Sequence, residues 1–476
     1  AAGLAEYLKE TVKGEKSVAV AYDSRNKSRE FAFLSAAVFS SAGIKTYVFD
    51  ELVPTPVLSF AVRYLKTSAG VVVTASHNPK EYNGYKVYNA KGCQITEEAA
   101  LAITEKIENA SYFGKYKPNN SLITVLDNRV MNAFLSEVEK LSLFDGTASF
   151  APKIVYTPLN GAGYKPVTEI LKRIGVKDLT VVPEQAYPDG DFPTCPYPNP
   201  EEKAALGLAI ELAEKTNADM VLATDPDADR VGIAVRKKDG SFRLFNGNET
   251  GAIMENFILS VKSKNGSMPN NPVIVKTIVT SDMTTDIAKK YGAEVKEVLT
   301  GFKYIGETID SLEDPEDYVL GMEESYGYLV GRHVRDKDSV SAAMIIAEAA
   351  AYYSSLGKTL IDALEDLYAE FGYYKTALVS RVYPGEKGKE EMDALISGLR
   401  EKPLTEIAGM KINEFKDYSR GIENLPKSNV LSFIGDGIKV IVRPSGTEPK
   451  VKYYLTAKRP TEKESDEIVE LLKKNI

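Results

Sequence analysis

Three carboxylates stand at alternate positions in one short stretch of the sequence, Asp225, Asp227 and Asp229. This spacing lets oxygen ligands converge on one hard cation, and carboxylates this close repel one another unless a cation compensates. A calcium-binding EF-hand loop is excluded, because Arg230 and Arg236 occupy its sixth and twelfth positions, where Gly and Glu are needed. The stretch therefore predicts a Mg²⁺ site, and acidic residues that merely face water are the weaker interpretation.

A hydroxyl, an imidazole and an amine occur together nearer the N-terminus, at Ser76, His77 and Lys86. Asn83-Gly84 favours a two-residue hairpin, which would fold Lys86 back towards Ser76. We expect Lys86 to act as general acid and base, because a desolvated amine among cations can have a lowered pKa. His77 is expected to orient the loop. The alternative is that Ser76 and its neighbours only cap a turn.

Further polar groups lie on three other loops. Arg25 follows the expected strand 17–22, and the stretch 322–327 contains Glu323 and Ser325, whose side chains suit sugar hydroxyls. The stretch 443–450 combines hydroxyl residues, a glycine and cations, so its backbone N–H groups can cradle a phosphate. It contains Arg443, Ser445, Gly446 and Thr447.

Nucleotide-binding motifs are absent or incomplete in the sequence. No P-loop occurs, and the run 160–163, Asn-Gly-Ala-Gly, lacks the third glycine of a dinucleotide fingerprint. A tight turn between a strand and a helix is the better interpretation of that run.

The elements that must position these groups are short apolar strands that alternate with helical stretches. The loops with Arg25, Ser76 and Asp225 each follow such a strand, and open α/β sheets bind ligands at the carboxyl ends of their strands. The strands expected before the candidate loops are 17–22, 69–74, 219–224, 295–299, 318–321 and 438–443.

Length and composition set the outer limits. A chain of 476 residues is too long for one core. We expect domains at 1–148, 149–240, 241–372 and 373–476. The formal charge of −8 gives no reason to expect a nucleic-acid partner. No apolar run approaches the roughly 20 residues of a membrane span, so no membrane partner is expected. The two cysteines lack any disulfide or metal spacing, which favours a cytoplasmic protein.

Four motifs in a fixed order resemble those of the α-D-phosphohexomutase superfamily. They are Thr-Ala-Ser-His-Asn-Pro at 74–79, Asp-Pro-Asp-Ala-Asp-Arg at 225–230, Met-Glu-Glu-Ser-Tyr-Gly at 322–327 and Arg-Pro-Ser-Gly-Thr-Glu-Pro-Lys at 443–450. The first looks most like the phosphoglucomutase branch. The resemblance implies three similar mixed α/β domains plus a smaller C-terminal α+β domain around a central cleft. Members begin with a strand and a Gly-Thr-x-Gly-x-Arg-type loop, so we expect this chain to begin inside the first domain.

The implied activity is the interconversion of glucose 1-phosphate and glucose 6-phosphate through a phosphoserine and a glucose 1,6-bisphosphate intermediate. By resemblance, Ser76 carries the phosphoryl group, Mg²⁺ binds that group and the three aspartates, and residues 443, 445, 446 and 447 hold the non-reacting phosphate. The substrate-binding residues implied are Arg25, Arg230, Lys303, Glu323, Ser325, Arg335 and Lys337. The resemblance also implies that the binding partners are small sugar phosphates. The protein is then a monomer or a homodimer.

Other activities remain open from the sequence. Phosphomannomutase and phosphopentomutase differ from phosphoglucomutase by a few hydroxyl contacts. A Mg²⁺-dependent sugar phosphatase would release inorganic phosphate, whereas a mutase keeps total sugar phosphate constant. A non-catalytic sugar-phosphate-binding protein has little reason to keep both Ser76 and the three aspartates.

Overall fold

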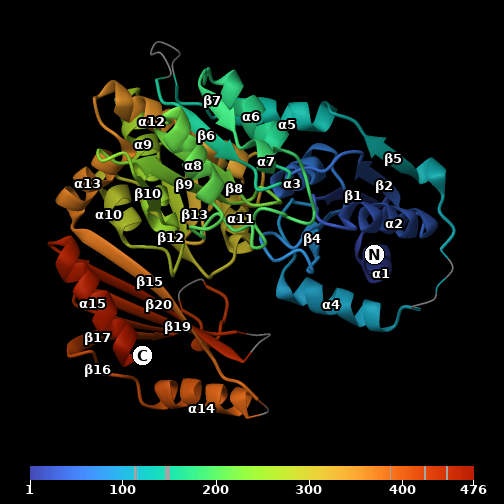
Figure 1. Ribbon diagram of the computed structural model, residues 1–476. Helices are drawn as coiled ribbons and strands as arrows, with labels where there is room; N and C mark the ends of the chain where they lie inside the picture. The colour runs from blue at the N-terminus through green and yellow to red at the C-terminus, as the bar shows by residue number, and fades with distance from the viewer. Residues whose placement is uncertain (112–113, 115, 145–150, 386, 423–424, 446–448) are drawn as a thin grey trace.

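The computed structural model describes residues 1–111, 114, 116–144, 151–385, 387–422, 425–445 and 449–476. Within these residues the chain forms four sheets, each built from one consecutive segment (Figure 1). The first three are mixed sheets covered by helices, and the fourth is an antiparallel sheet set apart from them at the lower left of the view. The expected fold class, three mixed α/β units plus a C-terminal α+β unit, is confirmed.

The three mixed sheets share one plan. A central strand has a parallel neighbour on each side, and an antiparallel strand pairs with one of these two neighbours. The strand orders are β4-β3-β1-β2-β5, β10-β9-β8-β6-β7 and β12-β11-β13-β14. The chain therefore reverses direction across the sheet at the equivalent strand pairs β1/β3, β6/β8 and β11/β13. Such a switch point is where open α/β sheets bind ligands.

The bounds of the elements follow the chain. The first unit has strands β1 Ser17–Tyr22, β2 Lys45–Phe49, β3 Ala69–Val73, β4 Tyr85–Asn89 and β5 Ile123–Leu126, with helices α1 Ala2–Thr11, α2 Ser28–Ser41, α3 Thr55–Tyr64, α4 Glu97–Glu108 and α5 Arg129–Glu139. The second has β6 Ile154–Thr157, β7 Leu179–Val181, β8 Met220–Thr224, β9 Val231–Arg236 and β10 Phe242–Phe245, with α6 Tyr164–Arg173, α7 Pro183–Ala186 and α8 Gly207–Thr216.

The third unit has β11 Val273–Thr277, β12 Glu294–Val298, β13 Tyr318–Glu323 and β14 Gly327–Val330, with α9 Gly247–Lys264, α10 Met283–Lys290, α11 Phe302–Ser311, α12 Ser339–Ser355 and α13 Leu360–Phe371. The fourth has β15 Tyr373–Val382, β16 Glu406–Ile407, β17 Met410–Asp417, β18 Leu431–Gly435, β19 Ile438–Pro444 and β20 Lys450–Arg459, with α14 Gly388–Glu401 and α15 Glu462–Asn475. Short 3₁₀ turns lie at Asn120–Leu122, Pro315–Asp317 and Tyr418–Arg420.

The central strands are buried on both faces. In β1, Val18 and Val20 face one core together with Leu4 and Phe39, whereas Ala19 and Ala21 face the larger core that extends into the second and third units. Alternation along a strand sends neighbouring side chains to opposite faces, so a continuous apolar run is what a strand between two helical layers requires. The larger core joins the three mixed units into one body.

The connection between β3 and β4 differs from the sequence prediction. Val73 pairs with Tyr85, so the turn is the long segment 74–84, and the two-residue hairpin expected at Asn83-Gly84 is wrong. The Thr74 N–H donates to the Gly84 carbonyl, and a Cβ on Gly84 would lie 2.5 Å from the Thr74 carbonyl oxygen. Gly84 therefore closes the base of a long loop, and Lys86 still lies on the returning strand.

Two unit boundaries can be placed from the sheets. β10 pairs with β9, so the second sheet continues past residue 240 and we propose its end after Phe245. Gly372 alone separates α13 from β15, and we propose the last boundary there. The boundary expected at residue 148 lies outside the described residues. Among the described helices, none combines the length and the apolar character needed to cross a membrane.

Candidate active site

Three loops that follow equivalent strands meet at one place. Ser76 lies after β3, Asp225 directly follows β8, and Glu323 ends β13. The Ser76 hydroxyl donates a hydrogen bond of 2.8 Å to Asp225 Oδ2, and the Thr55 N–H donates to the Asp227 carbonyl over 2.8 Å. An isolated β-bridge between Arg230 and Gly327 joins the second and third loops. The repeated topology thus brings the serine, the acidic cluster and the Glu-Glu-Ser loop together.

The aspartate cluster has the properties of a cation site. Asp225, Asp227 and Asp229 are at most 1% exposed, and each offers a carboxylate oxygen within 4.8 Å of the others. Oδ1 of Asp227 and Oδ1 of Asp229 are buried and have no hydrogen-bond partner among the described residues. Buried carboxylate oxygens are costly without a partner. Oxygen ligands in a tight, acidic group suit Mg²⁺, so the residues present fit the metal that the sequence predicts.

Two lysines lie against the cluster. Lys86 Nζ is 2.8 Å from Asp227 Oδ2, and Lys337 Nζ is 3.3 Å from Asp229 Oδ2. Burial and the neighbouring carboxylates raise the pKa of Asp225 well above its usual range. For Lys86, burial lowers the pKa, but Asp227 and Asp229 outweigh it and raise the pKa overall. The lowered pKa expected for Lys86 is therefore wrong, because its neighbours are mainly anions.

Arg25 holds the serine loop by its backbone. Its guanidinium donates to the carbonyls of Ser76 (2.6 Å), Asn78 (2.5 Å), Pro79 (2.9 Å) and Tyr82 (3.0 Å). The side chain is buried and has Asp23 and the ring of Phe192 as further neighbours. Ser76 has a left-handed backbone, with φ of 53°, which costs free energy for a residue with a Cβ. The carbonyl bonds of Arg25 offset that cost, so Arg25 supports the loop where the sequence suggested a substrate contact.

His77 lies next to the serine hydroxyl, with Nδ1 3.2 Å from Ser76 Oγ. Its ring is edge-on to Tyr197, and burial, followed by the charge of Arg230, lowers its pKa to about 3. His77 is therefore a neutral imidazole in contact with the serine hydroxyl, and its part in orienting the loop stays a prediction.

The glycines at 161 and 163 pack behind the aspartate loop. A Cβ on Gly161 would lie 2.4 Å from Pro226 Cα, and one on Gly163 would lie 2.5 Å from Thr224 Oγ1. The Ala162 N–H donates to the Pro226 carbonyl. The turn at 161–163 therefore packs directly against the aspartate loop. This agrees with the prediction of a tight turn and not with a nucleotide site.

The two glutamates of the Glu-Glu-Ser loop accept hydrogen bonds from within the third unit. Glu323 Oε1 accepts from the Gly301 N–H over 2.9 Å, and Glu324 Oε2 accepts from Thr277 Oγ1 over 3.2 Å. Ser325 is half-buried. Burial, and then the charge of Glu323, raises the pKa of Glu324 to about 7.

The remaining cations that the sequence predicts at the site contact different partners. Arg230 Nη1 lies 2.7 Å from Glu201 Oε1, and its backbone N–H donates to Asp225. Lys303 faces Glu97 of the first unit at 3.8 Å. Arg335 Nε donates to Asp310 over 2.8 Å, and its Nη1 donates to two backbone carbonyls. The structure therefore does not bring Lys303 or Arg335 to the aspartate cluster.

The C-terminal unit contributes a basic strand pair. Arg443 on β19 is in register with Lys452 on β20, and Lys450 also acts on Lys452. Burial and the two neighbouring cations lower the pKa of Lys452. Ser445 donates its N–H to the Lys450 carbonyl, while Gly446 and Thr447 lie outside the described residues. Sequence reasoning missed Lys452, although its place two residues beyond Lys450 on a strand could have indicated the same face.

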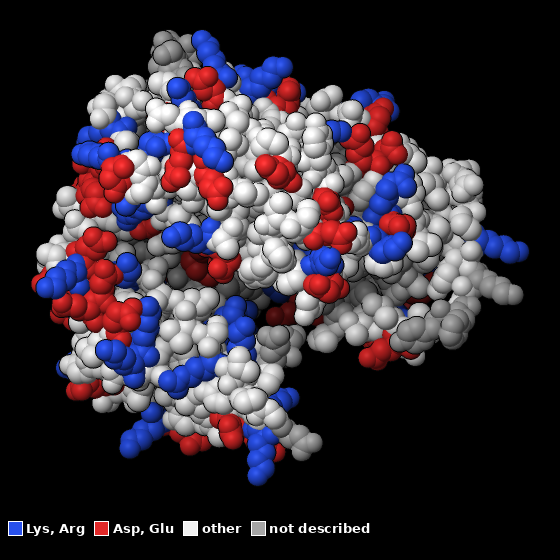
Figure 2. Space-filling model, viewed as in Figure 1, with Lys and Arg blue, Asp and Glu red and all other residues white. Residues whose placement is uncertain are grey.

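Figure 2 shows the hollow between the C-terminal unit and the body, with basic side chains along the border that the C-terminal unit forms. Lys452 is also close enough to Glu324 and Glu201 for their charges to affect it. The basic strand pair of the C-terminal unit therefore lies within electrostatic reach of the Glu-Glu-Ser loop.

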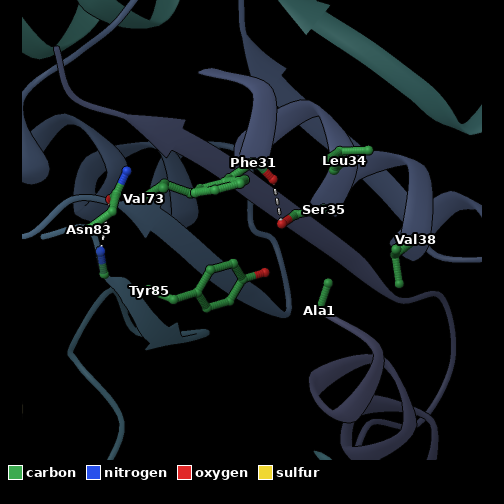
Figure 3. A pocket seen from close by; sticks show the side chains of 9 residues that line it. Ala1, Phe31, Leu34, Ser35, Val38, Val73, Asn83 and Tyr85 are labelled. Carbon is green, nitrogen blue, oxygen red and sulfur yellow. Dashed lines mark hydrogen bonds between the residues drawn. The ribbon is translucent and has the colours of Figure 1, made fainter. Parts of the chain in front are cut away.

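A second hollow, of about 450 Å³, lies along the edge strand β4 and is mainly apolar (Figure 3). Phe31, Leu34 and Val38 of α2 line one side, and Tyr85 of β4 and Ala1 line the other. It holds no acid, histidine or lysine, so we assign it no part in the chemistry.

Known proteins share this arrangement along the whole chain. Family models described as phosphoglucomutase/phosphomannomutase α/β/α domains I, II and III match residues 1–113, 132–240 and 246–371. A phosphoglucomutase of Staphylococcus haemolyticus is 36% identical over 96% of this chain and 85% of its own length. A Haemophilus influenzae protein named as a phosphomannomutase is 38% identical over 98% of this chain and 93% of its own length. The open form of the Paramecium phosphoglucomutase parafusin superposes with a TM-score of 0.75, at 19% identity, over 98% of this chain and 90% of that one.

Three repeated α/β units and a fourth, antiparallel unit, together with these matches, define a multidomain sugar-phosphate enzyme. More narrowly, the chain belongs to the phosphoglucomutase/phosphomannomutase family of the α-D-phosphohexomutase superfamily. It is a phosphohexomutase, an isomerase of carbohydrate metabolism.

Proposed function

We propose that the enzyme interconverts glucose 1-phosphate and glucose 6-phosphate through a phosphorylated Ser76. The observation that carries this proposal is the 2.8 Å contact between the Ser76 hydroxyl and Asp225 inside a buried aspartate triad. A serine hydroxyl needs no acidic triad to bind a sugar, but a phosphate on that serine needs a cation beside it. The phosphoglucomutases among the relatives support the choice of reaction.

The residues that would hold Mg²⁺ are Asp225, Asp227 and Asp229, together with the phosphate on Ser76. Bound there, the ion would neutralise charge on the phosphoryl group, which is most of what phosphoryl transfer requires. Lys86 and Lys337 add positive charge at the edge of the triad, and His77 and Arg25 fix the serine.

In the first half-reaction, the bond between phosphorus and Ser76 Oγ breaks and a bond from phosphorus to a sugar hydroxyl oxygen forms. The hydroxyl proton leaves the sugar, and Ser76 regains a proton. We propose Lys86 as the group through which protons pass, because its amine lies beside the triad. The product, glucose 1,6-bisphosphate, turns end for end and returns its other phosphate to Ser76.

The sugar and the distal phosphate are proposed to bind between the third and fourth units. Glu323 and Ser325 would contact sugar hydroxyls, and Arg443, Ser445, Gly446 and Thr447, with Lys452, would hold the non-reacting phosphate. Neighbouring cations on paired strands repel one another, so a phosphate placed between Arg443 and Lys452 would lower the free energy of both.

The test is a comparison of Ser76→Ala with Ser263→Ala, an exposed serine on α9. We expect mass spectrometry to find phosphate on Ser76 of the purified enzyme, and Ser76→Ala to lose turnover of glucose 1-phosphate while Ser263→Ala keeps it. Release of inorganic phosphate would indicate a phosphatase instead. Side-by-side rates with mannose and ribose 1-phosphates decide between phosphoglucomutase and the related mutases, and faster turnover of either would overturn the choice of glucose.

A further inference from the structure

A separate cavity of about 530 Å³ lies between α5 of the first unit and α9, β13 and β14 of the third. Side chains of Glu137, Lys140, Lys262, Glu316 and Arg332 place charge on its wall. None of the groups described above for the reaction lines it. Cavities of this size at junctions between units are typical places for small ligands.

The charges on the wall do not cancel. Lys140 Nζ lies 2.7 Å from Glu137 Oε1, and Arg332 pairs with Glu316. Lys262 has no acidic partner among the described residues that line the cavity, and it is half-buried. Burial lowers the pKa of Lys262, and no carboxylate of the described residues acts to raise it. The cavity therefore carries one uncompensated positive charge.

His333 adds a second unsatisfied group to the wall. Its side chain is 4% exposed, and Nε2 lies 2.9 Å from Asp338 Oδ2. Nδ1 is buried and has no hydrogen-bond partner in the part of the chain that the structure describes. A buried ring nitrogen without a partner costs free energy that a ligand group could recover.

We propose that this cavity is a second ligand site, which takes a small molecule bearing a carboxylate or phosphate group against Lys262, with His333 on the same wall. The anion would neutralise Lys262, which has no acidic partner among the described residues of the wall, and the size of the cavity leaves room for a small metabolite around it.

The site is connected to the catalytic centre through one short segment. His333 and Lys337 belong to the connection between β14 and α12, and Asp338, the partner of His333, caps α12 by accepting from the Val340 and Ser341 N–H groups. Lys337 in turn contacts Asp229. A ligand beside His333 would thus act on the segment that positions Lys337.

Crystals of the full chain soaked in selenate, and separately in 4-bromobenzoate, test the proposal by anomalous scattering. We expect a peak against Lys262 in one or both soaks, which also tells a tetrahedral anion from a carboxylate. In Lys262→Met this peak should vanish. In Lys140→Met it should remain, because Lys140 lines the same cavity but already pairs with Glu137.

Two results would overturn the proposal. One is the absence of a peak against Lys262 in both saturating soaks, whether or not the catalytic cleft binds the anion. The other is a peak that persists unchanged in Lys262→Met. Neither result depends on activity, so failure of this second site and failure of the proposed reaction are distinguishable.

Discussion

The guanidinium of Arg25 bonds to the backbone carbonyl of the serine that we propose as phosphoryl carrier, and to carbonyls of residues that follow it. Lysine keeps the charge but not the planar fork that reaches several carbonyls at once. We expect Arg25→Lys to lower kcat by roughly 10- to 100-fold, since losing one charge-assisted hydrogen bond costs about 1.5 to 3 kcal/mol. KM should change little. Steady-state kinetics measure both constants, and added guanidinium should partly restore Arg25→Ala.

Arg29→Lys is the matched control, because Arg29 lies at the start of α2, close to Arg25 in the sequence, and is largely exposed. It should behave as the wild type. A raised KM with kcat retained in Arg25→Lys would instead favour the substrate contact that the sequence suggested.

The aspartate triad leads to a prediction about metal and stability together. Asp225→Asn removes one of three buried like charges, so we expect thermal stability without metal to be unchanged or slightly raised. Ligand binding to the folded state stabilises it by mass action, and this gain from Mg²⁺ should disappear in the variant. Thermal unfolding with and without Mg²⁺ measures the effect, with the exposed Asp239→Asn as control. A wild-type enzyme indifferent to Mg²⁺ would contradict the metal site.

Site residues could be predicted from the sequence where they belong to one short motif. Ser76 and the alternating aspartates could be singled out from spacing, and the structure places them in contact. The uses of Arg25, Lys303 and Arg335 could not, because their partners are carbonyls or acids remote in sequence. Lys86 was misjudged for the same reason: whether its neighbours are anions or cations depends on the meeting of two units.

At the scale of elements, α12 carries a buried acid whose titration should be visible. Glu348 accepts from Ser142 Oγ and the Leu143 N–H, and burial raises its pKa from 4.5 to about 7. A carboxyl group with a raised pKa in the folded state stabilises that state below its unfolded pKa. This contribution is lost as pH rises from about 4.5 to 7.

We therefore expect wild type to lose stability relative to Glu348→Gln between pH 5 and pH 8, by about 3 kcal/mol at most. Thermal unfolding of both proteins at the two pH values gives the difference, with Glu370→Gln, an exposed acid on α13, as control. Parallel stability curves for wild type and Glu348→Gln would show that the carboxyl group is not perturbed.

The three similar mixed units were expected only from the family resemblance, because the sequence shows no clear internal repeat. Strands such as β1 and β3 could be recognised as apolar runs, but the equivalence of β3, β8 and β13 appears only in the pairing order. The long turn 74–84 was also missed, because Asn83-Gly84 is a strong local hairpin pattern that the close approach to Thr74 overrides.

At the scale of the molecule, the C-terminal unit is docked on the third unit by contacts that can be loosened. Asp286 accepts from Tyr374 on β15 at 2.6 Å and pairs with Lys458 on β20 at 2.8 Å. Lys439 similarly lies 3.2 Å from Asp282. Because Arg443 comes from this unit, its docking should affect the binding of sugar phosphate.

We expect Tyr374→Phe combined with Lys458→Met to raise KM several-fold and to increase the radius of gyration in X-ray scattering, since each polar contact contributes about 0.5 to 1.5 kcal/mol. High salt should shift wild type in the same direction. Lys463→Met, on the exposed face of α15, is the control. An unchanged scattering profile and KM would mean that the apolar cluster around Ile441 and Tyr454 is sufficient for docking.

The closure of the serine loop by Gly84 limits the insertions and deletions that this loop can accept. Val72 pairs with Lys86, and side chains on a strand alternate between faces, so a slip of one residue in the pairing would turn Lys86 away from Asp227. A deletion or insertion of a single residue within 77–83 must either force that slip or pull Ser76 from its place. The number of residues between the serine and the lysine is therefore itself under constraint, and tolerated changes of length should fall in other loops.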